Sequence, residues 1–125
     1  MNRIQITDNF KWKHIVCPCC GRLIINNRLF DHMGIMQDIR DDLGFVIIIT
    51  SGYRCPPHNE EEGGSEGSQH MKFATDARPE WGAGFYKRLA ALYNEVDKRF
   101  KGVGKYKSWT HGDLRTGHKV RWDQT

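Results

Sequence analysis

The feature that most constrains the fold is a short apolar run at residues 45–50, with the sequence Phe-Val-Ile-Ile-Ile-Thr. β-Branched side chains pack well on a pleated sheet, and an apolar run without polar alternation is typical of a strand covered on both faces. The run is far too short to cross a bilayer. The sequence therefore predicts a central buried strand around which the other elements assemble.

Two helices are predicted, one before and one after this strand. Apolar residues recur at helical spacing across residues 29–43, and Gly44 follows as a stop signal. A second amphipathic segment covers residues 85–100, and Gly102 and Gly104 are expected to end it. Each helix has one apolar face, which requires another element to cover it.

Three short β-prone segments complete the pattern, at residues 73–78, 109–114 and 119–122. The last two surround Thr116 and Gly117, which predicts a hairpin-like ending. The chain contains no internal repeat and no low-complexity tail. The expected fold is therefore a mixed α+β fold, and a chain of 125 residues is expected to form a single domain over residues 1–125.

The segment at residues 51–69 is a long polar loop with four glycines, two prolines and three consecutive glutamates. Long loops inside small domains are usually functional or disordered. Because this one leads directly into His70, we expect it to be functional. The glutamate run within it is expected to be solvated.

Composition excludes some classes of protein and leaves others open. The net charge is +4, but basic residues are scattered among acids, so no nucleic-acid-binding stripe is expected. No segment is long and apolar enough for a signal peptide or a membrane span. We expect a monomeric protein that is made in a cytoplasm and does not insert into a membrane.

His70, Asp76 and His111 are candidate ligands of a catalytic zinc ion. Two imidazoles and one carboxylate suit this metal, and three protein ligands leave a fourth position for water. Asp76 lies six residues after His70, so a common metal requires a turn between them. By spacing alone, a histidine is more often a surface or hydrogen-bonded residue than a metal ligand, and Asp76 can cap an element or pair with Arg78.

Two further residues are candidates for catalysis. Asp113 lies two residues after His111, so both side chains project from one face of a strand, and the carboxylate can act as a general base. Its structural alternative is to orient His111 or to pair with Arg115. Arg54 follows the apolar strand and can bind a substrate carboxylate or stabilise an oxyanion, or simply hold a loop.

The four cysteines raise the alternative of a second zinc site. Cys17 and Cys20 form a C-x-x-C step with the proline and glycine of a zinc knuckle, but no second pair of ligands follows at comparable spacing. Cys55 with His14 or His58 completes such a site only if the polar loop at residues 51–69 folds back on the N-terminal segment. The favoured interpretation is that all the cysteines are reduced, small buried apolar residues.

The surrounding sequence resembles zinc D-Ala-D-Ala carboxypeptidases, in particular their phage and prophage branch, which shares its fold with the Hedgehog signalling domain. The shared motifs, in the family's order, are Thr50-Ser51-Gly52-Tyr53-Arg54-Cys55-Pro56-Pro57-His58-Asn59, Gly63-Gly64, Ser68-Gln69-His70-Met71, Ala74-Thr75-Asp76, Gly102-Val103-Gly104-Lys105-Tyr106 and Thr110-His111-Gly112-Asp113-Leu114-Arg115. The resemblance covers residues 17–115.

This resemblance implies a small antiparallel sheet with flanking helices and a zinc peptidase acting on peptidoglycan stem peptides, at D-Ala-D-Ala or at an L-Ala-D-Glu bond. It implies His70, Asp76 and His111 as metal ligands and Arg54 as a substrate or oxyanion contact. Other residues match positions that shape the site, some as substrate contacts: Ser51, Tyr53, Asn59 and Ser68. Such an enzyme reaches the cell wall through phage lysis machinery or as a virion component.

The chain departs from the family pattern in two places. The spacing between His70 and Asp76 is one residue shorter than usual, and Phe73 stands near the position of a family glycine. Ser108 and Trp109 occupy the positions of the usual catalytic base, which makes Asp113 the candidate and leaves His58 or His118 as alternatives. The missing acid also favours a second hypothesis, a non-catalytic zinc-stabilised wall-binding or virion module. A zinc-knuckle nucleic-acid binder is the third.

Overall fold

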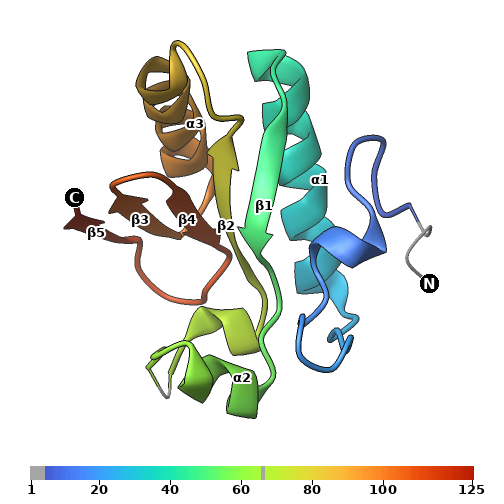
Figure 1. Ribbon diagram of the computed structural model, residues 1–125. Helices are drawn as coiled ribbons and strands as arrows, with labels where there is room; N and C mark the ends of the chain where they lie inside the picture. Colours follow the sequence, from blue (N-terminus) through green and yellow to red (C-terminus); the bar gives the residue numbers. More distant parts are fainter. Residues whose placement is uncertain (1–4, 66) are drawn as a thin grey trace.

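The computed structural model describes residues 5–65 and 67–125. Within these ranges the chain forms a five-stranded sheet with helices against it (Figure 1). In chain order the elements are η1 (Trp12–His14), α1 (Asn27–Leu43), β1 (Ile47–Ser51), α2 (Pro56–Glu61), η2 (Gln69–Met71), β2 (Ala74–Pro79), α3 (Phe85–Arg99), β3 (Gly102–Tyr106), β4 (Thr110–Asp113) and β5 (Val120–Gln124). The predicted α+β fold is confirmed.

The strands lie in the order β1-β2-β4-β3-β5. The first four are antiparallel to their neighbours, whereas β5 runs parallel to β3. The sheet is therefore mixed, and the predicted hairpin-like ending is wrong. Both edges of β4 are already paired, with β2 and β3, so the chain crosses to the outer edge of β3 before it forms β5.

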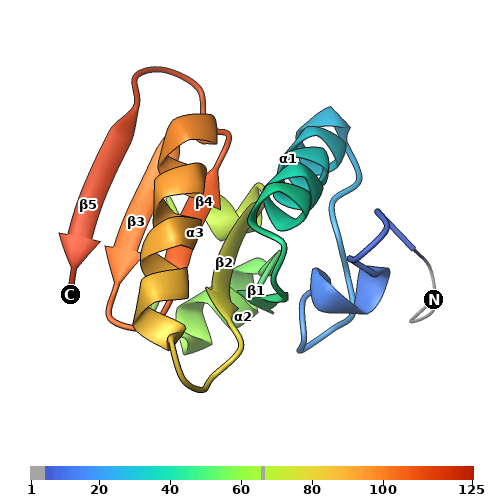
Figure 2. The same ribbon diagram turned by 90° about the horizontal axis from the view of Figure 1, so that it is seen from above.

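Helices α1 and α3 cover one face of the sheet (Figure 2). Their apolar stripes meet there in the core, which includes Leu29, Met33 and Met36 from α1 and Leu92 and Val96 from α3. Burying each such side chain contributes about 1.5–3 kcal/mol. The opposite face of β2 and β4 is left for polar side chains.

The ends of the two long helices follow local signals. The side chain of Asn26 accepts a hydrogen bond from the Leu29 backbone N–H at 2.9 Å, which caps the start of α1. Gly44 ends α1 in the left-handed conformation, as predicted. Helix α3 ends at Phe100, whose extended backbone leads directly into β3.

The apolar run at residues 45–50 forms an edge strand, so the prediction of a central strand is wrong. Strand β1 pairs with β2 on one side, and η1 contacts it as well. Ile47 is buried, Ile48 and Ile49 are half-buried, and Val46 is exposed. The more polar strands β2 and β4 lie in the interior of the sheet instead.

The polar segment at residues 51–69 contains more regular structure than predicted. Helix α2 begins directly after Cys55, with prolines in its first turn, where a missing N–H is tolerated. The segment ends in η2, which carries His70. Among the described residues, no helix is long and apolar enough to cross a membrane.

The sequence predicted that Gly102 and Gly104 end the second long helix. In the structure both glycines lie inside β3. A Cβ at Gly104 would approach the Trp122 ring to 2.6 Å, and one at Gly102 would collide with the side chains of Asp113 and Arg115. The glycines therefore make room on the sheet for side chains from neighbouring segments. Glycine also has low strand propensity, which explains why the sequence alone did not reveal β3.

We expect Gly52→Ala to destabilise the protein by about 1–3 kcal/mol, because a Cβ there would lie 2.6 Å from the Ile15 carbonyl oxygen. Urea unfolding measures this change. Gly34→Ala is the matched control, since its Cβ meets nothing within 4 Å and alanine favours the helix. Equal stability of the two variants would contradict the close approach of the Gly52 and Ile15 backbones.

Candidate metal centre

A row of cross-strand partners on the face opposite α1 and α3 sets the geometry of the site. Asp76 on β2 lies opposite His111 on β4, and Gly104 on β3 lies opposite His111 from the other side. Trp122 on β5 is in turn the partner of Gly104. Because cross-strand partners point to the same face, the pairing itself brings Asp76 and His111 together.

His70 joins this pair from η2. Its Nδ1 lies 2.7 Å from the Gly52 carbonyl oxygen, which can only accept, so Nδ1 carries the proton. The other ring nitrogen, Nε2, lies 3.3 Å from Asp76 Oδ2. Ser68 caps η2 by accepting a hydrogen bond from the His70 backbone N–H. The ring is therefore fixed with its lone pair toward Asp76.

His111 is held between two carboxylates. Its Nδ1 lies 3.0 Å from Asp76 Oδ1, and its Nε2 lies 2.7 Å from Asp113 Oδ2. Asp113 is fully buried and accepts two side-chain hydrogen bonds from Arg115, at 2.8 and 2.7 Å. This arrangement leaves Nδ1 of His111 as the nitrogen that faces His70 and Asp76.

The three residues fit a metal of the zinc class. One ligand atom from each of His70, Asp76 and His111 lies within 4.8 Å of the other two, and all three residues are buried. Bond lengths of about 2.0–2.1 Å in a tetrahedral site place ligand atoms roughly 3.3 Å apart. His70 Nε2 lies 3.3 Å from Asp76 Oδ2, and His111 Nδ1 lies 3.0 Å from Asp76 Oδ1, so each histidine faces one carboxylate oxygen at about this distance.

Electrostatics at Asp76 and His111 favour the charged forms of both side chains despite burial. Burial raises the pKa of Asp76, but its contacts with His111 and His70 outweigh burial and hold the pKa well below its usual range. Burial lowers the pKa of His111, whereas its hydrogen bonds to Asp113 and Asp76 outweigh this effect and raise it. The site thus keeps an ionised carboxylate available as a ligand.

Arg54 lies beside the triad. Its Nη2 is 3.6 Å from Asp76 Oδ2, its Nε donates to Ser51 Oγ at 3.2 Å, and its Nη1 donates to Asn59 Oδ1 at 3.4 Å. Asn59 is itself buried and donates to the Ser65 carbonyl oxygen. These contacts hold the guanidinium at the edge of the candidate centre.

The centre lies in a polar cavity of about 620 Å³. Its walls come from the loop before η2, which contributes Ser68, and from the aromatic residues Tyr106, Trp109 and Trp122. Tyr106 stacks on Trp109, with 4.6 Å between ring centroids, and its hydroxyl accepts a hydrogen bond from Trp122 Nε1 at 2.7 Å. The cavity therefore offers polar groups along one side and aromatic faces along the other.

Several residues that the resemblance implied lie elsewhere. Tyr53 is buried in the core and is not part of the cavity lining. Ser51 and Asn59 contact Arg54 rather than the cavity itself. The alternative proton carriers, His58 and His118, also lie outside the lining.

Asp113 shares its sheet face with His111, as predicted, but its geometry favours the alternative role. Its carboxylate contacts the His111 nitrogen that points away from Asp76, and it is not part of the cavity lining. Both of its oxygens accept hydrogen bonds from Arg115. Burial raises the pKa of Asp113, but the hydrogen bonds from Arg115 and His111 hold it well below its usual range. Such a group orients a ligand and is a poor proton acceptor.

The short connection between His70 and Asp76 passes through a backbone conformation that favours glycine. Phe73 has a φ of 146°, and its side chain is fully buried with its ring 4.9 Å from that of His32. The resemblance described above implied a glycine in this neighbourhood. Side-chain burial at Phe73 offsets the backbone strain, which costs about 1–3 kcal/mol at such positions.

The sequence did not reveal the residues that support the candidate ligands, Gly104 and Gly52. Gly104 leaves the space into which the Trp122 ring leans, 5.0 Å from the His111 ring. Gly52 supplies the carbonyl that fixes His70. Gly102 and Gly104, which flank Val103, were interpreted only as a helix end, although glycine inside a strand is typical of a close approach by another segment.

The cysteines also differ from the favoured interpretation. All four are free, as predicted. Cys17 and Cys55 are buried, but Cys19 and Cys20 are exposed, so the description as small buried apolar residues is wrong for these two.

Comparison with known proteins identifies the family. A family model described as Peptidase M15 matches residues 8–113, a range that contains the triad, Arg54 and Asp113. No curated protein matches the chain at a significant level. The match covers most of the chain, and the α+β fold agrees with it. The chain therefore belongs to the peptidase M15 family.

Proposed function

We propose that the protein is a zinc peptidase that cleaves peptidoglycan stem peptides, at D-Ala-D-Ala or at an L-Ala-D-Glu bond, and that it derives from a phage or prophage. The observation that carries this proposal is the convergence of His70, Asp76 and His111 in the cavity beside Arg54. The family match supports a peptide as the substrate. Delivery to the cell wall by lysis machinery or by a virion fits this role.

His70, Asp76 and His111 would hold the zinc ion, which supplies Lewis-acid activation of water and of the scissile carbonyl. The Gly52 carbonyl fixes the ring of His70, and Asp113 fixes that of His111. These contacts orient both histidine rings before a metal binds, so little reorganisation of the histidines is needed.

Arg54 is suited to bind a negative charge at the cavity edge. Ser51 and Asn59 hold its guanidinium, and its Nη2 approaches Asp76. A fixed guanidinium stabilises either a peptide carboxylate or the charge that develops on a carbonyl oxygen during hydrolysis. The aromatic wall formed by Tyr106, Trp109 and Trp122 would pack against the rest of the stem peptide.

Mass spectrometry of purified peptidoglycan after incubation with the zinc-loaded protein tests this function. Loss of terminal D-Ala identifies a carboxypeptidase, and release of peptides beginning with D-Glu identifies an endopeptidase. An unchanged muropeptide profile with zinc fully bound would contradict the proposal. It would support the second candidate, a non-catalytic wall-binding or virion module, which is favoured by the absence of an acid at residues 107–110.

For Asp113→Asn, we expect zinc affinity to fall by about 10- to 100-fold, with turnover at saturating zinc retained within roughly tenfold, because Asp113 orients His111. Competitive zinc titration and peptidase assays measure the two quantities separately. If Asp113 is instead the proton acceptor, zinc affinity stays unchanged and turnover is lost. Glu62→Gln is the companion variant, since Glu62 lines the cavity and lies outside the triad.

A further inference from the structure

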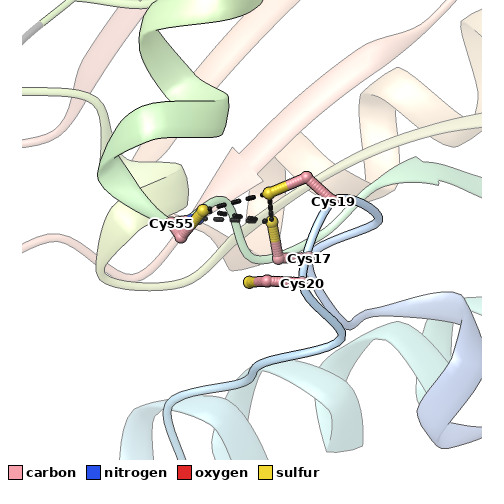
Figure 3. A group of neighbouring side chains, drawn as sticks. All are labelled: Cys17, Cys19, Cys20 and Cys55. Carbon is pink, nitrogen blue, oxygen red and sulfur yellow. Dashed lines mark hydrogen bonds between the residues drawn. The ribbon is translucent and has the colours of Figure 1, made fainter.

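The side chains of Cys17, Cys19, Cys20 and Cys55 lie together (Figure 3). None of the four lines the polar cavity. Three of the cysteines come from a single turn near the N-terminus, and Cys55 comes from the start of α2, more than thirty residues later. We propose that these four thiolates bind a second zinc ion with a structural role. The sequence had suggested His14 or His58 as completing ligands, whereas Cys19 completes the set.

The distances fit a tetrahedral site of four sulfurs. The sulfurs of Cys17, Cys19 and Cys55 lie 3.2–3.5 Å from one another. All four sulfurs lie within 4.8 Å of one another. Zinc–sulfur bonds of about 2.3 Å place tetrahedral sulfurs roughly 3.8 Å apart, so small side-chain shifts accommodate the ion. A site closed by four protein ligands is typical of structural zinc.

The backbone around Cys17 forms a closed turn that presents the sulfurs. The Cys17 N–H donates to the Arg22 carbonyl oxygen at 2.8 Å, and the Gly21 N–H donates to the Cys17 carbonyl oxygen at 2.7 Å. Gly21 has a φ of 68°, a left-handed conformation that glycine adopts without strain. This turn holds Cys19 and Cys20 on the same side as Cys17.

One backbone amide also faces the sulfurs. The Cys55 backbone N–H points at Cys17 Sγ, 3.5 Å away. A thiolate accepts such a hydrogen bond well, and the thiolate is the form of cysteine that binds metal.

The cluster would tie the N-terminal segment to one wall of the candidate active site. Next to Cys55, the Tyr53 N–H donates to the Ile15 carbonyl oxygen at 2.9 Å, and Gly52 packs directly on the Ile15 backbone. The Gly52 carbonyl fixes His70, and Arg54 lies between Tyr53 and Cys55. A metal at the four sulfurs therefore supports the segment that positions both residues.

Metal analysis of the full-length protein and of matched variants tests this proposal. We expect two zinc ions per chain in the native protein. We expect one in Asp76→Ala, which keeps all four cysteines, and one in Cys20→Ser, which changes an exposed ligand and keeps the triad. Cobalt substitution of Asp76→Ala should give the intense near-ultraviolet absorption of thiolate-to-cobalt charge transfer, because its remaining ligands are sulfurs. In the same variant, zinc should protect the four thiols from a thiol reagent until a chelator is added.

Three results would overturn the assignment. The first is an Asp76→Ala variant that is folded, holds no zinc and has four freely reactive thiols. The second is a native protein lighter by two hydrogens under non-reducing conditions, which indicates a disulfide within the cluster. The third is iron in place of zinc, detected by metal analysis and visible absorption. The catalytic and the structural zinc proposals use different residues, so they can fail separately. A protein that binds zinc at the cysteines but does not cleave peptidoglycan would contradict the proposed function and leave the cysteine site standing.

Discussion

Replacement of His70 by alanine is expected to abolish peptidase activity, with a fall in kcat/KM of at least roughly a thousandfold. In the proposed mechanism His70 is one of three metal ligands, and its loss would remove Lewis-acid stabilisation worth about 4 kcal/mol in the transition state. Zinc bound at the triad should be lost together with activity. Parallel assays of stem-peptide hydrolysis and of metal content measure both effects.

His118→Ala is the matched control, because His118 is exposed and lies outside the cavity lining. It should retain native activity and metal content. Circular dichroism of both variants establishes that the fold is intact. A folded His70→Ala protein with native turnover would refute the assignment of the triad.

Acidification is expected to destabilise the protein through His32, starting well above the range in which carboxylates titrate. His32 is fully buried in α1, where Nε2 lies 2.8 Å from Thr75 Oγ1. Burial lowers its pKa from 6.5 to about 3. The unfolded chain therefore binds a proton at pH values where the folded protein does not, and stability falls as pH drops from about 6.5 toward 3. At about 1.4 kcal/mol per pKa unit, the loss approaches roughly 5 kcal/mol at the acidic end.

Urea unfolding between pH 6.5 and 4.5, in the presence of a chelator, measures this effect without a contribution from metal release. The upper part of this window lies above the range in which Asp76 and Asp113 change stability, because their lowered pKa values act only once pH falls through about 4 and below. His32→Gln should show a flatter dependence of unfolding free energy on pH. Identical slopes for the native protein and His32→Gln would rule out this role for His32.

The fold was predictable where a single physical signal determines an element. Helix α1 follows from apolar periodicity and from Gly44, both of which act locally. The run at residues 45–50 was wrongly predicted as a central strand. Apolar residues indicate that a strand is buried, but they do not indicate which elements cover it. Contacts with η1 and the core cover β1 at the sheet edge, and neither has a local signature in the run itself.

The sequence allowed the candidate ligands to be named, but it did not determine how the surrounding side chains contact them. His70, Asp76 and His111 have metal-binding chemistry that is visible in sequence, and they do converge. The role of Asp113 depends on which His111 nitrogen it contacts, and strand alternation fixes only the face. Likewise, the thiol cluster depends on a contact between the N-terminal turn and Cys55, which no local spacing encodes.

The pairing of Asp76 with His111 across β2 and β4 has a consequence for folding as well as for chemistry. A slip of one residue in this register would turn His111 toward α3 and place Gly112 beside Asp76. Metal binding at the triad is therefore possible in one register of the two strands and not in the neighbouring one. The ion would select the correctly paired sheet among its competitors, and zinc uptake during refolding would report the moment at which that pairing is reached.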